Sequence, residues 1–144
     1  MAKVLYTAEA NVAGGRAEGH GKTSDGALEV DLRIPEGMGG PGGGTNPEQL
    51  FAVGYAACFE GALAVAARRA RVEAGDAEID SKVKLLPTKE GGFELAVELD
   101  VRLPSMEDGS AAVELVRAAH EVCPYSNATR GNIEVALNAN GESV

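Results

Sequence analysis

The sequence contains no tryptophan, and aromatic residues make up only 4% of its 144 residues. A chain of this length can bury a core, so the core must be built mainly from aliphatic residues and alanine. Basic residues are also scarce, because 13 lysines and arginines stand against 22 acidic residues and leave a net charge of −9. Binding to nucleic acid or to an anionic membrane surface needs a basic face, and we therefore expect neither partner.

Other absences concern the cellular compartment. The first residues include no apolar run long enough for a signal peptide. The longest weakly polar run, residues 50–67, is rich in alanine and interrupted by Glu60, so we do not expect it to span a membrane. We therefore expect a cytoplasmic protein, in which thiols stay reduced and a structural disulfide is disfavoured. The two cysteines, Cys58 and Cys123, are then core thiols, metal ligands or a redox pair.

The apolar periodicity predicts a single α+β domain over residues 1–144. Strands are expected at residues 3–12, 16–23, 27–34, 78–86, 92–103 and 132–139. Helices are expected from Pro47 to about Arg71 and from about residue 108 to Cys123, where Pro124 prevents continuation. This order of antiparallel hairpins and two helices is typical of α+β proteins.

Two of these segments give more detailed predictions. Apolar and polar residues alternate in LEVDLRI, so Leu28, Val30, Leu32 and Ile34 are expected to face the core. The segment at residues 35–45 is rich in glycine but lacks the lysine and spacing of a phosphate-binding loop, and we interpret it as a flexible rim.

The start of the first helix is clearly marked. Asn46 is a good N-cap, Pro47 fits the first helical position, and Glu48 suits the positive end of the helix dipole. Gln49 completes a variant of the capping box. The next turns are apolar on every side, which predicts a central, buried helix.

Cys58 lies inside this apolar helix, and Cys123 ends the second one. Cys123 shares an apolar face with Ala112, Val116 and Ala119, so both cysteines should point into the core. Two such thiols can approach to disulfide distance, but the residues leave open whether they form a redox pair or two separate core thiols. A metal site that uses His120 lacks the paired spacing of zinc ligands, and we expect both histidines, His20 and His120, to be structural or solvated.

The electrostatic settings of the two cysteines differ. Cys123, at the end of a helix, should remain a thiol because the dipole disfavours an anion there. The apolar surroundings of Cys58 should raise its pKa, so that it is inert unless a cation lies near. Candidate cations are Arg16, Arg33, Arg102, Arg117 and Arg130. Arg16 follows Gly14 and Gly15, which gives it an unusual backbone setting, although the residues alone favour a solvated surface role for it.

Two segments together resemble one family. The runs GTNPEQLFAVGYAACFEGAL (44–63) and CPYSNATRGNIEV (123–135) are similar to the two cysteine motifs of the organic hydroperoxide resistance proteins, which are thiol peroxidases of the OsmC superfamily. The run from Leu28 to Gln49 resembles that family too, and the order of elements fits its whole length. The resemblance implies an OsmC-like α+β fold in an intertwined homodimer.

The resemblance also implies a role for individual residues. Cys58 matches the peroxidatic cysteine, Cys123 the resolving cysteine, Arg16 the arginine that holds the thiolate, and Glu48 the carboxylate that orients this arginine. The implied reaction reduces organic hydroperoxides, including those of fatty acids, to alcohols and leaves a Cys58–Cys123 disulfide. It needs no metal or other cofactor, and the disulfide is recycled by dihydrolipoamide or a lipoylated protein. The apolar wall around Cys58 is expected to consist of Leu50, Phe51, Tyr55, Phe59 and Met38.

Overall fold

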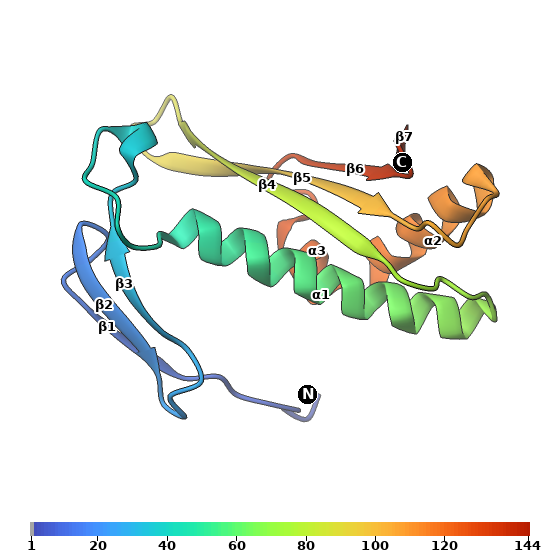
Figure 1. Ribbon diagram of the computed structural model, residues 1–144, viewed down its shortest axis with the longest axis horizontal. Helices are drawn as coiled ribbons and strands as arrows, with labels where there is room; N and C mark the ends of the chain where they lie inside the picture. Colours follow the sequence, from blue (N-terminus) through green and yellow to red (C-terminus); the bar gives the residue numbers. More distant parts are fainter. Residues whose placement is uncertain (1) are drawn as a thin grey trace. The chain divides into compact units, whose positions relative to one another are not determined.

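The computed structural model describes residues 2–144, and the chain divides into two compact units, one up to Leu50 and one over residues 51–144. The first unit contains a three-stranded antiparallel sheet of β1 (Ala10–Ala13), β2 (Glu18–Thr23) and β3 (Glu29–Arg33), in that order (Figure 1). The predicted hairpin is confirmed. Its turn is held by Asp25, whose carboxylate accepts from the Thr23 hydroxyl at 2.8 Å and from the Ala27 amide at 2.9 Å. That the whole chain forms one domain stays a prediction.

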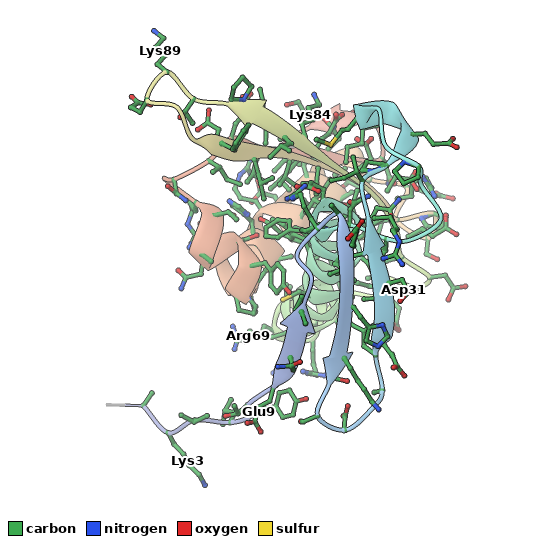
Figure 2. All side chains as sticks on the ribbon, turned by 90° about the vertical axis from the view of Figure 1, so that its left-hand side faces the viewer. Lys3, Glu9, Asp31, Arg69, Lys84 and Lys89 are labelled. Carbon is green, nitrogen blue, oxygen red and sulfur yellow. The ribbon has the colours of Figure 1, made fainter. Side chains whose placement is uncertain are left out.

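The first strand is shorter than predicted. Only Ala10–Ala13 pairs, because the neighbouring strand ends at Thr23, directly opposite Ala10. Residues 3–9 form no regular element, and Figure 2 shows Lys3 projecting from this segment. The prediction that Leu28 faces the core is also wrong, since Leu28 is 45% exposed. It belongs to the hairpin turn, where its carbonyl accepts from the Thr23 amide, and the alternation begins only after it: Leu32 is buried and Val30 is half-buried.

Helix α1 (Pro47–Ala70) agrees with its predicted bounds within one residue. The Asn46 side chain accepts from the backbone amide of Gln49 at 2.8 Å, as an N-cap does. Gln49 does not return the bond, because its side-chain oxygen accepts from the Thr45 hydroxyl at 2.7 Å. The rim before the helix includes the short 3-10 helix η1 (Glu36–Met38), in which Met38 is 54% exposed.

Only one face of α1 is buried within the chain. The buried face consists of Tyr55, Phe59, Ala62, Leu63, Ala66 and Ala67. The opposite face carries Val53, which is 72% exposed, and the exposed residues Ala57, Gly61 and Ala64. The prediction of a helix buried on all sides therefore does not hold for the single chain. Among the described residues, α1 is also the one helix whose length and composition would allow it to cross a membrane, but its buried face packs into the core of the second unit.

The second unit is built on a sheet of β4 (Glu78–Pro87), β5 (Phe93–Arg102), β6 (Val135–Ala139) and β7 (Glu142–Ser143), in that order. Figure 1 shows the helices of this unit on one side of the sheet, and Figure 2 shows Lys89 at the tip of the β4–β5 hairpin. Val97, Leu99 and Val101 of β5 form the inner, buried row. The sheet is mixed rather than purely antiparallel, because the chain crosses over through two helices and β6 then pairs parallel with β5.

Helix α2 (Gly109–Val122) begins and ends where the sequence predicts. The Asp108 side chain caps its first turn, and Cys123 follows its last residue. The predicted apolar face is confirmed, since Ala112, Val116, Ala119 and Cys123 are all fully buried. A further short helix, α3 (Pro124–Thr129), follows immediately and was not predicted. Pro124 ends α2 but is also well suited to start a new helix, because its missing N–H would have no partner in a first turn.

Candidate active site

The two cysteines meet in the second unit, one from α1 and one from the junction of α2 and α3. Their Sγ atoms lie 3.7 Å apart, and both are free thiols. Cys58 is partly accessible, whereas Cys123 is completely buried. A disulfide has an S–S length of about 2.05 Å, so the two sulfurs need to move together by less than 2 Å, a distance within reach of side-chain rotation. The geometry therefore allows one accessible thiol to react and the other to bond with it.

The surroundings of Cys58 in this unit favour the neutral thiol. Partial burial raises the pKa of Cys58 most strongly, and the neighbouring Cys123 thiol raises it further. The backbone amide of Tyr125 acts in the opposite direction by favouring the charged sulfur, but it does not outweigh the burial. A Cys58 thiolate at neutral pH thus requires a further positive charge, as the sequence predicts.

Cys123 occupies a more complex position than the end of one helix. It is the C-cap of α2 and, at the same time, the N-cap of α3, and its sulfur accepts from the backbone amide of Ser126 at 3.4 Å. The predicted helix C-terminus at Cys123 is confirmed, but the backbone amide of Ser126 in α3 also donates to the sulfur, so the expectation that Cys123 remains a thiol stays a prediction.

Three aromatic rings cluster on α1 and α3: Phe51 and Tyr55 lie about two turns and one turn before Cys58, and Tyr125 lies in α3. Phe51, Tyr55 and Tyr125 have pairwise ring-centroid distances of 5.6–5.9 Å, within the range of favourable aromatic contacts. Tyr125 lies against Gly54, where a Cβ atom would come within 2.9 Å of the tyrosine oxygen. Gly54 is thus the position of α1 that lets this ring pack close to the helix.

A buried cluster of hydroxyl groups connects the same two helices. The Tyr55 hydroxyl is 2.8 Å from the Ser126 oxygen and 3.1 Å from the Thr129 oxygen. Tyr55 and Ser126 are fully buried, and Thr129 is 6% exposed. Tyr125, Ser126 and Thr129 were not predicted to be site residues. The signal that could have found them is their position directly after a cysteine and Pro124, where a new capped helix can start.

Arg16 and Glu48 meet in the first unit. Both terminal guanidinium nitrogens donate to the carboxylate, at 2.9 and 3.3 Å, in a bidentate pair. Arg16 lies in the turn between β1 and β2, next to Gly14, which has φ +85° and whose Cβ would meet the Glu18 carbonyl oxygen at 2.4 Å. Partial burial is the largest single influence and raises the pKa of Glu48, but the hydrogen bond from Arg16, a backbone hydrogen bond and the charge of Arg16 together outweigh it and hold that pKa below its usual range.

The other candidate arginines each have hydrogen-bond partners of their own. Arg33 donates to the Gly19 and Leu32 carbonyl oxygens, and Arg102 pairs with Glu78 and Asp80.

The same holds in the α2–α3 region. Arg117 pairs with Glu114, and Arg130 donates to the His120 carbonyl oxygen at 2.9 Å and to Asn127. Of the five candidates, Arg16 is thus the one that pairs with Glu48, the carboxylate that the family resemblance assigns to orient it.

The residues expected to form an apolar wall have different degrees of burial. Tyr55 and Phe59 are fully buried in the core of the second unit, and Phe51 is half-buried against it. Leu50 is half-buried and Met38 is exposed, both in the first unit. Their contact with a substrate stays a prediction.

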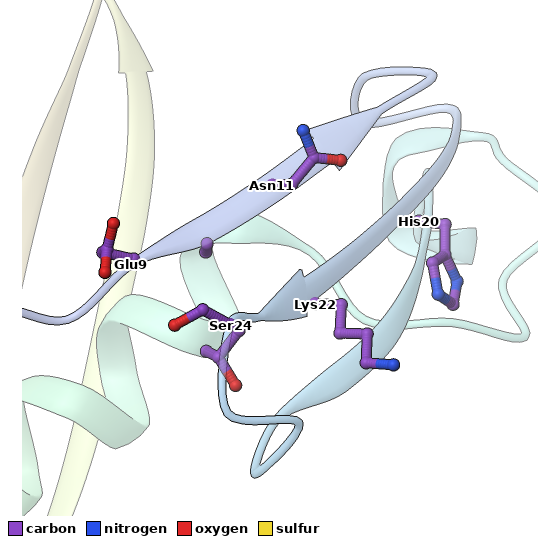
Figure 3. Close-up of a pocket in the computed structure, with 7 residues that line it drawn as sticks. Glu9, Asn11, His20, Lys22 and Ser24 are labelled. Atoms are coloured by element: carbon purple, nitrogen blue, oxygen red, sulfur yellow. The ribbon is translucent and has the colours of Figure 1, made fainter.

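Within residues 2–144, neither histidine is hydrogen-bonded to a cysteine. Among the described residues, Nδ1 of His120 is buried without a hydrogen-bond partner, and burial and the charge of Arg130 lower the His120 pKa. His20 lies on the outer surface of the first sheet, between Asp31 at 2.9 Å and Glu29 at 2.8 Å. It lines an open cavity of about 520 Å³ together with Asn11 and Lys22 (Figure 3). This cavity contains neither cysteine.

Comparison with known proteins gives a consistent assignment. Residues 40–138 match the model of the family described as OsmC-like protein. An organic hydroperoxide resistance protein from Xanthomonas axonopodis pv. citri is 55% identical over 139 residues, covering 94% of each chain. The organic hydroperoxide resistance protein OhrB from Bacillus subtilis is 48% identical over 134 residues, which cover 92% of this chain and 96% of that protein.

Solved structures agree with these sequences. The crystal structure of an organic hydroperoxide resistance protein from Legionella pneumophila matches with a TM-score of 0.89 and 49% identity, over 94% of this chain and 98% of that chain. The B. subtilis OhrB structure matches with a TM-score of 0.85 at 48% identity, over 94% and 98% of the two chains. The fold is thus that of the OsmC-like proteins. Within that class, the chain belongs to the family of organic hydroperoxide resistance proteins.

Proposed function

We propose that the protein is a cysteine-based peroxidase that reduces organic hydroperoxides, including those of fatty acids, to alcohols. The observation that carries the proposal is the pair of free thiols 3.7 Å apart, one accessible and one buried. The names of the relatives support a role in the detoxification of peroxides.

In the first step, the Cys58 thiolate attacks the terminal oxygen of ROOH. The O–O bond breaks, the RO⁻ group leaves and takes up a proton as the alcohol, and Cys58 becomes a sulfenic acid. In the second step, the Cys123 sulfur attacks the Cys58 sulfur, and the hydroxyl group leaves with the thiol proton as water. The two thiols thus supply both electrons, and the product is the Cys58–Cys123 disulfide.

Arg16 supplies the positive charge that this mechanism requires. Burial alone keeps Cys58 neutral, and a guanidinium close to the sulfur lowers the cost of the thiolate. The Glu48 carboxylate holds the Arg16 side chain in a single bidentate geometry, so that the cation is oriented before substrate arrives. We propose that the assembled site brings this pair to Cys58.

The substrate's organic group would contact apolar side chains. Phe51 is half-buried and packs against Tyr55, one helical turn further along α1. Tyr55 and Phe59 are themselves fully buried. Leu50 and Met38 would complete the wall from the first unit. Such a wall favours bulky organic hydroperoxides over hydrogen peroxide, because only an organic group removes apolar surface from water on binding.

We further propose a cytoplasmic homodimer with two-fold symmetry. The exposed face of α1, with Val53, Ala57, Gly61 and Ala64, is a row of small and apolar residues on a helix of 24 residues. Exposed apolar surface of this kind is typical of a protein interface. A second copy of the chain would cover it and would bring two α1 helices together at small residues.

A shared active site would follow from such a dimer. Glu48 and Cys58 are ten residues apart on α1, which corresponds to about 15 Å of axial rise and to different faces of the helix. The Arg16–Glu48 pair of one chain could then serve the cysteines of its partner. The recycling reductant, by resemblance to the family, is a dihydrolipoyl group, either free dihydrolipoamide or one carried by a lipoylated protein.

The decisive experiment measures consumption of cumene hydroperoxide and of hydrogen peroxide, each with dihydrolipoamide or with thioredoxin as reductant. We expect repeated turnover with cumene hydroperoxide and dihydrolipoamide, at a rate well above that with hydrogen peroxide. Cys58→Ser should abolish it, because a serine hydroxyl does not ionise at neutral pH, and Cys123→Ser should permit one reaction without an internal disulfide. A single stoichiometric oxidation without turnover under every condition would instead indicate a redox sensor and would overturn the proposal.

A further inference from the structure

The short helix α3 starts at the resolving cysteine and is tied to α1 by buried hydroxyl groups. It has only six residues, too few to be stable by itself in water. Its position therefore depends on contacts with the rest of the unit. Two sets of contacts connect it to α1: the Tyr125 ring packs over Gly54, and the Tyr55 hydroxyl forms hydrogen bonds with Ser126 and Thr129.

These hydrogen bonds connect the elements that carry the two sulfurs. Tyr55 precedes Cys58 by three residues on α1, so the two lie about one turn apart on the same side of the helix. Ser126 follows Cys123 by three residues, and its backbone amide donates to the Cys123 sulfur. The Tyr55 hydroxyl thus joins the cysteine-bearing turn of α1 to the first turn of α3.

Loss of these hydrogen bonds would destabilise the observed position of α3, because the groups that they join are buried. Tyr55 and Ser126 are fully buried, so Tyr55→Phe removes this partner of the Ser126 hydroxyl, and Ser126→Ala leaves the Tyr55 hydroxyl with Thr129 alone. A buried polar group that loses a partner destabilises the arrangement, and this is the cost of the change. Movement of α3 toward water would relieve that cost and carry Cys123 away from Cys58. Reactions between held groups are sensitive to such displacement, because a shift of about 1 Å can lower the rate a hundredfold.

We propose that Tyr55, Ser126 and Thr129 form a positioning cluster that holds the Cys123 sulfur close to that of Cys58, at the observed 3.7 Å, from which a small movement forms the disulfide. The inference rests on the proposed function, because it concerns the second step of that reaction: the S–OH bond of oxidised Cys58 and the S–H bond of Cys123 break, and an S–S bond and water form. Tyr55 and Ser126 are positioning residues here, and they do not touch the reacting oxygen.

The test separates the two steps in full-length Tyr55→Phe and Ser126→Ala proteins, each with one equivalent of cumene hydroperoxide. In Ser126→Ala, sulfenic acid formation on Cys58 should stay within about twofold of wild type, since neither Cys58 nor any residue of the proposed apolar wall is changed. Disulfide formation should slow about tenfold or more. The longer-lived sulfenic acid should be trapped by dimedone, or oxidised further to sulfinic acid, in a larger fraction of molecules.

Matched variants show whether the cluster acts as one unit. Tyr6→Phe removes the same hydroxyl from a ring that is 78% exposed, and it should leave both steps unchanged. The double variant Tyr55→Phe/Ser126→Ala should be no slower than the slower single variant, because both changes break the same connection. If Tyr55→Phe does not fold, Ser126→Ala and the near-isosteric Thr129→Val carry the test.

A parallel series with diamide as oxidant distinguishes this inference from the proposed function. Diamide oxidises a thiol pair to a disulfide without any hydroperoxide, so it reports the approach of the two sulfurs even if the protein is not a peroxidase. Slower disulfide formation in the variants with diamide supports the positioning cluster. Unchanged disulfide formation with both oxidants would overturn it, and so would an equal slowing of both steps, which would indicate general support of the α1 core.

Discussion

Arg16 and Glu48 are 32 residues apart in the chain, yet both guanidinium nitrogens of Arg16 bind the Glu48 carboxylate. We propose that this pair provides the cation that the mechanism needs. Arg16→Ala should therefore raise the pKa of Cys58, because burial then acts without a compensating charge. Titration of the thiolate absorbance against pH measures this change.

Two further variants sharpen that measurement. Glu48→Gln keeps a hydrogen-bond acceptor for Arg16 but removes the charge that orients it, so it should slow the Cys58 reaction less than Arg16→Ala does. Arg117→Ala is the matched control, since Arg117 is exposed and pairs only with Glu114 among the described residues. A Cys58 midpoint that does not move in the Arg16→Ala protein would mean that another cation serves the site.

The pKa of His20 should lie above the ordinary histidine value, and that of His120 below it. Hydrogen bonds to Asp31 and Glu29 raise the pKa of His20, whereas burial and the charge of Arg130 lower that of His120. Because the folded-state pKa of His20 is raised, its contribution to stability is present below about pH 6.5 and is lost as the pH rises through the folded-state value. NMR titration of the two ring signals measures both, and Asp31→Asn should lower only the His20 value. Coincident midpoints would contradict the contacts of both rings.

Much of the fold follows from local patterns in the sequence, and the exceptions have physical causes. The caps at Asn46 and Asp108 and the stop at Pro124 act within a few residues, so they predict the helix bounds correctly. The pairing of β6 with β5 is not local, because its direction depends on where the crossover returns the chain. For the same reason, the contacts of Tyr55 with α3, 71 and 74 residues away, could not be read from spacing.

Gly54 should be required for the packing of Tyr125. Alanine is more favourable than glycine in a helix by about 1 kcal/mol. In Gly54→Ala, however, the new Cβ would lie 2.9 Å from the Tyr125 oxygen, and such overpacking costs about 1–3 kcal/mol. We expect no gain, or a loss of up to about 2 kcal/mol, in the free energy of unfolding. In a Tyr125→Ala background the same change should stabilise the protein, and equal effects in both backgrounds would show that the ring does not oppose it.

The exposed face of α1 should mediate the proposed dimer. Ala57 is exposed in the single chain and lies at the centre of that face, so Ala57→Glu places a charge there at little cost to a monomer. In a dimer the charge would be buried without a partner, which favours dissociation. Sedimentation equilibrium should therefore show a dimer for the wild type and a shift toward monomer for Ala57→Glu. Ala118→Glu, the same change at an exposed alanine of α2, is the control and should leave the dimer intact; a wild-type monomer would contradict the proposed interface.

Complementation between inactive chains should reveal whether the site is shared. Cys58→Ser and Arg16→Ala chains, refolded together in equal amounts, pair at random, so about half of the dimers contain one of each. If Arg16 of one chain serves Cys58 of the other, each mixed dimer has one intact site and one site that lacks both groups. The mixture should then recover about a quarter of wild-type activity. Chains that carry both substitutions, mixed with wild type, are the control for loss by dilution. Verified mixed dimers without activity would place Arg16 and Cys58 of each site in the same chain, because then every site in the mixture lacks one of the two groups.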